Sequence, residues 1–264
     1  MFWFDTRTAQ ERRQDALEER RVKMAREKDP VPWDPAMPFT PILHIHGDTY
    51  NPLSLFKVKP CPPSLNDPNQ AWASTKRNFV LSPKGTWGYR EMILREGSVL
   101  QTFCGNRRGV VVFDAPVKIP MLNKRLADGK TWRFNPWMSF TPMEIFSLRP
   151  GTRLACGHTV IAGLGMGHQL SEVCKKRSVK RVTLIEESQE LVDWILPKVE
   201  LHGKKVEVII GDAYKLVPPM ECDVVLIDIF KGYGGNREDW MYGTQFASMN
   251  YRKHMWIWGA QSLG

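Results

Sequence analysis

Four short apolar runs in the second half of the chain constrain its fold more than any other feature. They are TVIAGL (159–164), RVTLI (181–185), VEVII (206–210) and DVVLID (223–228). Strands that are almost continuously apolar are typical of a parallel sheet covered on both faces. Between the second and third runs, an apolar stripe at helical spacing predicts a helix that begins at Ser188, bends at Pro197 and stops at Gly203. Strands alternating with helices predict right-handed crossovers and an α/β fold with a Rossmann-like open parallel sheet.

Composition divides the chain into four regions. They are a charged helical arm (1–28), a proline-rich wrapping segment (29–77), a small β region with a linker helix (78–150) and the Rossmann-like domain (151–264). The arm mixes both charges around a thin apolar seam, so it is expected to be mostly exposed or to dock on a partner or a second subunit. The wrapping segment holds ten of the nineteen prolines, which prevents long regular elements. Trp33, Phe39 and Phe56 are its expected anchors.

The small β region is expected from residues 78–119. They are rich in β-branched and aromatic residues, with turns at Gly97 and in the GNRRG stretch (105–109), and predict one small antiparallel sheet. After this sheet, the motif TPME spells a capping box with proline at the first helical position. A linker helix should therefore start at Thr141, and Glu144 has a structural role before any catalytic one.

A glycine-rich loop follows the first apolar run. In VIAGLGMGHQL, Gly163, Gly165 and Gly167 stand at every second position. Because glycine has no Cβ atom, such a loop can turn sharply and let a ligand rest on its backbone. In open α/β sheets, ligands bind beyond the carboxyl ends of the strands. The loop therefore predicts a small-molecule site.

Three acids stand at the ends of successive strands. Glu186 ends the second strand, 19 residues beyond Gly167, close to the spacing of about 20 expected for a carboxylate that binds ribose hydroxyls. Asp212 ends the third strand and Asp228 the fourth. Each alone is equally well explained as the N-cap of a following helix. The three together predict one cleft bordered by carboxylates.

Two classes of cofactor compete for this loop. A dinucleotide-binding loop requires G-x-G-x-x-G, but His168 occupies the position of the third glycine. This disfavours a nicotinamide-dependent oxidoreductase. The G-x-G-x-G spacing suits a cofactor without a pyrophosphate.

The four motifs resemble those of a known superfamily. VIAGLGMG, VTLIEES, VEVIIGDAY and DVVLIDIF are similar to the successive motifs of class I S-adenosylmethionine-dependent methyltransferases, nearest the branch that contains spermidine synthases. The similarity covers residues 155–232, and the preceding small β region also resembles that branch. Only 36 of the 264 residues follow Asp228, enough for a helix (237–254) and a strand (255–260). The resemblance thus implies a sheet of order 3-2-1-4-5, C-terminally shortened from seven strands, with the N-terminal region covering the substrate side.

The resemblance also implies roles for individual residues. The cofactor-binding residues would be Gly163, Gly165, Gly167, Glu186, Asp212 and Ala213. Glu186 would hold the ribose hydroxyls of S-adenosylmethionine, and Asp212 would accept from the adenine amino group. Asp228 would lie closest to the sulfonium and orient or deprotonate an attacking amine or hydroxyl. No metal is implied.

The sequence departs from the family in its substrate motifs. Lys231 stands near the place of a second acid in polyamine aminopropyltransferases, and a lysine there would repel a cationic polyamine. The signatures of amino-methylating and cytosine-methylating nucleic-acid enzymes are absent. Trp137, Tyr233 and Trp240 are expected either to wall a pocket or to fill the core between the two regions, with the core favoured for Trp240.

These observations predict an S-adenosylmethionine-dependent transferase, most simply a methyltransferase with an undetermined acceptor. Two alternatives remain open: an aminopropyltransferase-like enzyme, and an inactive module that keeps the fold for binding or structure. The net charge of +9 is explained by a nucleic-acid partner and equally well by a generally basic surface.

The remaining composition sets the expected compartment. Five scattered cysteines without a C-x-x-C pair predict free thiols and a cytoplasmic protein, and no apolar run is long enough to span a membrane. His44 and His46 share one face of a possible short strand. Without a third ligand at recognisable spacing, a plain strand is favoured over a metal site.

Overall fold

The computed structural model of this chain describes residues 8–10, 13, 16, 34–47, 50, 53–58, 60, 79–132, 136–230 and 255–259. Most of the predicted charged arm and the whole of the predicted helix 237–254 lie outside these residues. Trp33, Lys231, Tyr233 and Trp240 lie outside them as well. Within the described ranges, no helix is both long and apolar enough to cross a membrane.

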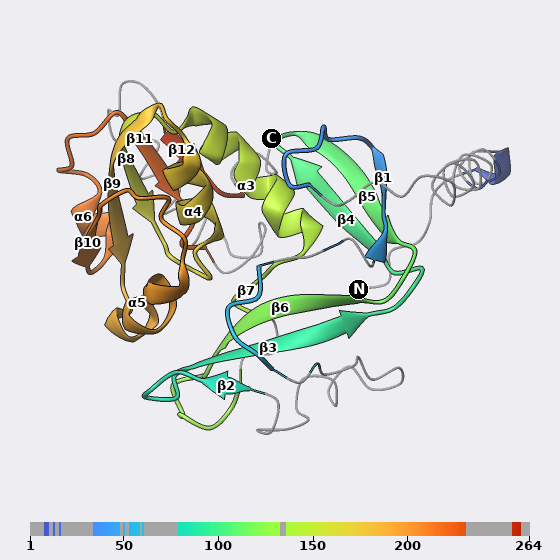
Figure 1. Ribbon diagram of the computed structural model, residues 1–264, viewed down its shortest axis with the longest axis horizontal. Helices are drawn as coiled ribbons and strands as arrows, with labels where there is room; N and C mark the ends of the chain where they lie inside the picture. The colour runs from blue at the N-terminus through green and yellow to red at the C-terminus, as the bar shows by residue number, and fades with distance from the viewer. Residues whose placement is uncertain are drawn as a thin grey trace.

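The second half of the chain forms a five-stranded parallel sheet (Figure 1). Its strands are β8 (Gly157–Ala162), β9 (Val179–Glu186), β10 (Val206–Ile210), β11 (Val224–Ile227) and β12 (Met255–Ile257). Neighbouring strands follow the order β10-β9-β8-β11-β12, and every pair is parallel. The predicted order 3-2-1-4-5 is therefore confirmed.

Helices cover both faces of this sheet because its strands are apolar on both sides. They are α4 (His168–Lys175), α5 (Gln189–Ile195) and α6 (Ala213–Leu216). Ile161 of β8 packs in one core with Leu170 of α4, while its neighbour Val160 packs in a second core with Ala213 of α6. The two faces of β8 thus carry the two cores.

The helix after β9 is shorter than the sequence predicts. Ser188 caps α5 as expected, because its hydroxyl accepts from the Leu191 N–H at 3.2 Å. The α-helix ends at Ile195, however, and continues only as the 3₁₀ turn η3 (Leu196–Lys198). Pro197 lacks an N–H for the helical ladder, so it ends the helix instead of bending one that reaches Gly203.

Helix α3 (Pro142–Leu154) joins the two halves of the molecule. It begins where the capping box predicts, with the Thr141 hydroxyl accepting from the Glu144 N–H. It lies between the parallel sheet and the strands of the first half (Figure 1) and runs across residue 151, where the Rossmann-like region was expected to begin. At Gly151 a Cβ would lie 2.4 Å from the Trp256 ring, so glycine permits this close packing.

The β region contains two sheets, and the prediction of one small antiparallel sheet was wrong in this respect. One sheet has the order β2-β3-β6-β7, from β2 (Val80–Leu81), β3 (Trp87–Leu94), β6 (Val117–Lys124) and β7 (Met138–Ser139). The other has the order β1-β5-β4, from β1 (Ile42–Ile45), β5 (Arg107–Phe113) and β4 (Val99–Cys104). The β4–β5 hairpin pairs locally, whereas β3 pairs with β6 beyond it. Strand β1 comes from the proline-rich segment and runs parallel to β5, a pairing that no local pattern predicts.

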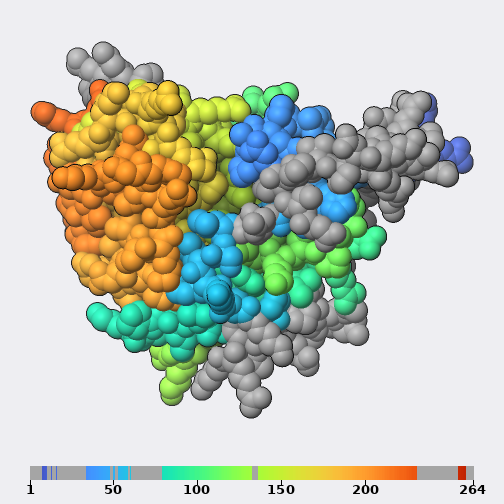
Figure 2. All heavy atoms as spheres, viewed as in Figure 1, coloured from blue at the N-terminus to red at the C-terminus, as the bar shows by residue number. Residues whose placement is uncertain are grey.

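The wrapping segment touches both halves of the molecule. Phe56 lies between Tyr89 of β3 and Trp194 of α5, with ring centroids 4.9 and 4.7 Å away. Figure 2 shows this blue segment, residues 53–58, against the orange surface of the Rossmann-like region. Phe39 packs edge-on against Phe146 of α3 at 5.3 Å. Both predicted anchors within the described ranges are therefore packed.

Candidate functional site

Three other parts of the protein pack closely against the glycine loop that follows β8. Gly163, Gly165 and Gly167 have φ values of +100°, +52° and +82°, a region that favours glycine. A Cβ at Gly163 would lie 2.1 Å from the Asp228 carbonyl oxygen. At Gly165 it would lie 2.3 Å from the sulfur of Met138, and at Gly167 it would lie 2.2 Å from Val199. The protein itself therefore needs all three glycines.

Glu186 lies directly against this loop. One carboxylate oxygen accepts from the Leu164 N–H at 2.8 Å, and the other accepts from the Ser188 N–H at 3.0 Å. Burial raises the pKa of Glu186, while these two N–H groups and the charge of Lys124 lower it. Glu186 is not an N-cap, because Ser188 caps the following helix. The structure thus brings the carboxylate and the glycine loop together, as the sequence predicts.

The four-stranded sheet supplies a wall beside Glu186. The ammonium of Lys124 lies 5.0 Å from the centre of the Trp87 ring and 4.9 Å from that of Trp137, within cation–π range. The two rings meet edge-on at 5.4 Å. The Trp87 indole N–H also donates to the Ser188 hydroxyl at 3.1 Å. Trp137 therefore contributes both to this wall and to the packing between the two regions.

Asp212 has a different environment at the end of β10. Its carboxylate accepts from the Tyr214 N–H at 2.9 Å and caps α6, and its side chain is 43% exposed. Lys215 approaches it at 3.8 Å. Ala213, the first residue of α6, is buried. The alternative of an N-cap, which the sequence left open, describes what Asp212 does here.

Asp228 follows β11 and shares its environment with Glu144. The Asp228 N–H donates to the Ala162 carbonyl at 2.9 Å, which holds the start of this loop on the end of β8. Burial raises the pKa of Asp228 to about 7. Burial and repulsion from Asp228 also raise the pKa of Glu144 well above its ordinary value. A pair with raised pKa values holds a proton near neutral pH and can accept another.

Hydrogen bonds through Trp258 fix α3 beside the end of β11. The Trp258 N–H donates to the Ile227 carbonyl at 2.9 Å, and its indole N–H donates to the Ser147 hydroxyl at 3.0 Å. That hydroxyl donates in turn to the Glu144 carbonyl at 2.8 Å. The first turn of α3, and with it Glu144, is therefore tied to the strand that ends at Asp228. The capping motif found Glu144 in the sequence but gave it only a structural role.

Gln169, at the start of α4, is a site residue that the sequence reasoning missed. Only 7% of its surface is exposed, and neither its amide oxygen nor its amide nitrogen has a hydrogen-bond partner in the described part of the chain. Lys176 lies seven residues further, on the same face of the helix, and its ammonium donates to the carbonyls of Thr152 and Arg153 in α3. Gln169 therefore faces the side on which α3 lies. Its position two residues beyond Gly167 is the only signal for it in the sequence.

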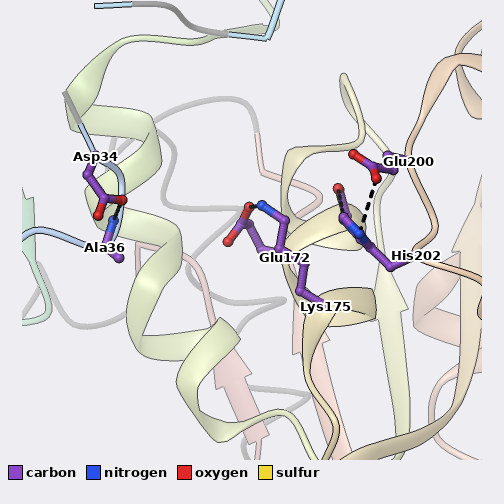
Figure 3. A network of polar contacts seen from close by, with 7 residues as sticks. Asp34, Ala36, Glu172, Lys175, Glu200 and His202 are labelled. Carbon is purple, nitrogen blue, oxygen red and sulfur yellow. Dashed lines mark hydrogen bonds and ion pairs between the residues drawn. The ribbon is translucent and has the colours of Figure 1, made fainter. Parts of the chain in front are cut away.

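The loop after η3 holds α4 in place. Val199 presses on Gly167, and the His202 Nε2 lies 3.3 Å from the Ser171 hydroxyl. Glu200 lies 3.3 Å from the other imidazole nitrogen, and Figure 3 shows this pair beside α4. A hydroxyl, an imidazole and a carboxylate in series also occur in nucleophilic enzymes. Here Ser171 is buried, so these three side chains stabilise the packing of the loop on α4.

The two histidines of the proline-rich segment lie in and just after a short strand. His44 lies in β1 and is buried, as the plain-strand interpretation predicts. Across the ranges that the structure describes, no three His, Cys, Asp or Glu side chains cluster closely enough to hold a metal ion.

Comparison with known proteins gives distant structural matches. No protein-family model and no curated protein matches the chain. Among solved structures, TrmK of M. capricolum in complex with S-adenosyl-homocysteine is 19% identical over 42% of this chain and 50% of its own, with a TM-score of 0.32. Spermidine synthase from Thermotoga maritima is 15% identical over 51% of this chain and 55% of its own (TM-score 0.30). Trm5b from Pyrococcus abyssi is 13% identical over 59% of this chain and 45% of its own (TM-score 0.33).

The chain thus spans about half the length of each of these structures. Because the identities and TM-scores are low, these matches assign no function to this chain.

Proposed function

We propose that this protein binds S-adenosylmethionine at the glycine loop and transfers its methyl group to an acceptor. The observation that carries the proposal is the contact between Glu186 and the Leu164 N–H, which sets a carboxylate against a loop of three glycines with positive φ. A carboxylate beside such a backbone suits an adenosyl ligand, because it can accept from both ribose hydroxyls.

The unpartnered amide of Gln169 supports the same ligand. The amino-acid end of S-adenosylmethionine carries an ammonium and a carboxylate. An amide can accept from the first and donate to the second, which would satisfy both buried atoms of Gln169. The start of α4 also favours a negative charge, because its first N–H groups and its dipole point toward the loop. We therefore place the amino-acid end near Gln169 and the ribose near Glu186. Asp212 and Ala213, at the end of β10, remain our candidates for the adenine end.

The carboxyl pair Glu144 and Asp228 is the proposed acid–base group. The bound cofactor supplies a methyl group on a sulfonium, and the protein has to align the nucleophile and manage its proton. Asp228 would hold the acceptor and take its proton, since its raised pKa matches a base that works near neutral pH. Burial and repulsion from Asp228 raise the pKa of Glu144, so Glu144 would keep its proton while Asp228 acts as the base. The Asp228 backbone lies directly against Gly163, so the pair is close to the glycine loop.

Calorimetric titration with S-adenosylmethionine and S-adenosylhomocysteine tests the proposed cofactor site. Glu186→Gln should weaken binding on the order of tenfold, because it loses a charge-assisted acceptor for the ribose. Glu187→Gln is the matched control, since this neighbouring acid is exposed and should leave binding unchanged. If the wild-type protein binds neither compound, the proposal fails.

A binding module without catalysis is the second candidate, and one observation favours it. The side chain of Met138 already lies on Gly165, where a ligand would be expected. An assay of methyl transfer separates the two candidates, because a module of this kind would bind the cofactor but never consume it. The aminopropyltransferase alternative depends on Lys231, which lies outside the described residues.

The proposed compartment is the cytoplasm. The four cysteines among the described residues are free thiols, as suits a reducing environment. Docking of a second subunit on the N-terminal arm, and a nucleic-acid partner for the net positive charge, remain proposals from the sequence alone.

A further inference from the structure

Two N–H donors of the glycine loop are already satisfied by side chains of the protein. Glu186 accepts from the Leu164 N–H, and the sulfur of Met138 accepts from the Met166 N–H at 2.8 Å. The thioether of Met138 also lies so close to Gly165 that a Cβ there would meet its sulfur at 2.3 Å and its methyl carbon at 3.4 Å. Met138 thus covers the middle of the loop. It reaches there from β7, in the four-stranded sheet.

The geometry points to Met138 as a displaceable plug, which a ligand must move aside if it carries a carboxylate toward the start of α4. This inference rests on the proposed function. Met166 stands between Leu164, on the Glu186 side, and the first turn of α4, on the Gln169 side. A ligand that runs from the ribose end to the amino-acid end therefore passes over the Met138 sulfur.

Replacement of the Met138 sulfur by the carboxylate of the ligand, as acceptor of the Met166 N–H, is chemically favourable. A thioether is a weak acceptor, whereas a carboxylate makes a charge-assisted hydrogen bond to the same N–H. Methionine has three rotatable bonds and no branch, so it can adopt another rotamer at low cost. The side chain of Met138 is partly exposed, which gives it a direction in which to leave.

The backbone of β7 stays in place during this exchange. The Trp137 N–H donates to the Leu122 carbonyl at 2.7 Å, and the Phe140 N–H donates to the Pro120 carbonyl at 2.9 Å. These bonds flank Met138 on both sides and hold its backbone on β6. The moving part is therefore the side chain alone.

Two ligands that differ only in the amino-acid end test the plug. S-adenosylhomocysteine carries the carboxylate, whereas 5′-methylthioadenosine has the same adenosine and thioether but no amino acid. Met138→Ala should tighten binding of S-adenosylhomocysteine on the order of fivefold, the effect of one competing hydrogen bond. It should leave binding of 5′-methylthioadenosine unchanged. Met92→Ala is the matched control, because Met92 is a partly buried methionine of the same sheet that packs in the other core.

The outcomes separate the plug from the cofactor site itself. Weaker binding of S-adenosylhomocysteine by Met138→Ala, or an equal gain for both ligands, would overturn the plug while leaving the cofactor site intact. Absence of binding by every protein, wild type included, would remove the proposed function, and the plug with it.

A second measurement titrates the wild-type protein, so its result does not depend on whether a variant folds. In wild-type protein with ¹³C-labelled methionine methyl groups, the Met138 signal, assigned with Met138→Leu, should shift on addition of S-adenosylhomocysteine. It should not shift with 5′-methylthioadenosine. A bound ligand that leaves the Met138 signal unmoved would contradict displacement.

Discussion

The acids at the strand ends differ in burial and in contacts between the centre and the edge of the parallel sheet. Beside the central strands β9 and β11, Glu186 and Asp228 are held against the glycine loop, and burial raises the pKa of both. At the edge strand β10, Asp212 caps a helix and is 43% exposed. The position at the end of a strand alone therefore does not hold a carboxyl against the glycine loop. What differs is the packing of the four-stranded sheet and α3 over the centre.

Glycine-to-alanine substitutions at the centre and at the edge of the sheet should give the largest difference in the free energy of unfolding. Both Gly163 and Gly211 have positive φ, so alanine is strained at either. At Gly163 the new Cβ would meet backbone, the Asp228 carbonyl at 2.1 Å, whereas at Gly211 it would meet the flexible end of Leu216 at 2.9 Å. Gly163→Ala should lower the free energy of unfolding by about 4 kcal/mol and Gly211→Ala by about 1–2 kcal/mol. Urea unfolding measures both, and equal losses would show that the centre is not the more tightly packed place.

Removal of the central acid should affect transfer more than binding. We expect Asp228→Asn to reduce transfer of a labelled methyl group from S-adenosylmethionine to acceptors in a cell extract by about 100-fold or more, as for loss of a general base. Affinity for S-adenosylhomocysteine should stay nearly the same. Asp223→Asn, beyond the opposite end of β11, serves as control, because its carboxylate only accepts from the His158 N–H. Undiminished label with Asp228→Asn would remove its proposed role.

The carboxyl pair should make stability depend on pH. The pKa of Asp228 is about 7 in the folded protein and near 3.8 ordinarily, so the folded state keeps a proton that the unfolded chain has released. The free energy of unfolding should therefore fall as pH rises from about 4 to about 7. Glu144→Gln removes the repulsion and should raise stability at pH 8 by about 1–2 kcal/mol, with little change at pH 4.

Chemical denaturation at both pH values checks the carboxyl pair. Glu221→Gln is the control, since Glu221 is exposed and precedes β11, whereas Asp228 follows the opposite end of that strand. If Glu144→Gln destabilises the protein equally at both pH values, the pair does not share a proton.

The edge acid should give the smallest effect. Asn caps a helix about as well as Asp, so Asp212→Asn should leave the free energy of unfolding within about 0.5 kcal/mol. Its affinity for S-adenosylhomocysteine should fall only about threefold if the side chain accepts from the adenine amino group, because the amide oxygen can still accept. Calorimetry decides this, and a loss as large as that of Glu186→Gln would erase the contrast between centre and edge.

The sequence predicts the parallel sheet well because each strand carries its own signal. Continuous apolar runs mark the strands, and Ser188 and Thr141 mark the helix starts through their hydroxyls. The split of the β region into two sheets has no such signal, since β3 pairs with β6 across the inserted β4–β5 hairpin. Long-range pairing of this kind depends on tertiary packing.

The same distinction applies to the site. Glycines and strand-end acids are visible in a motif, so Glu186 and Asp228 are predictable from their spacing. Gln169 and Met138 depend on what faces them across the fold, and neither lies in a pattern that marks it. Met138 is brought to the loop by the first half of the chain, whereas Gln169 follows the loop directly and is marked only by its burial without a hydrogen-bond partner among the described residues.

A structure determined in the presence of S-adenosylhomocysteine tests the central claim most directly. The account predicts the ribose on the Glu186 carboxylate, the carboxylate of the ligand on the Met166 N–H, and the Met138 side chain turned away from Gly165. A ligand bound elsewhere, or a glycine loop still covered by Met138 at saturating ligand, would contradict it.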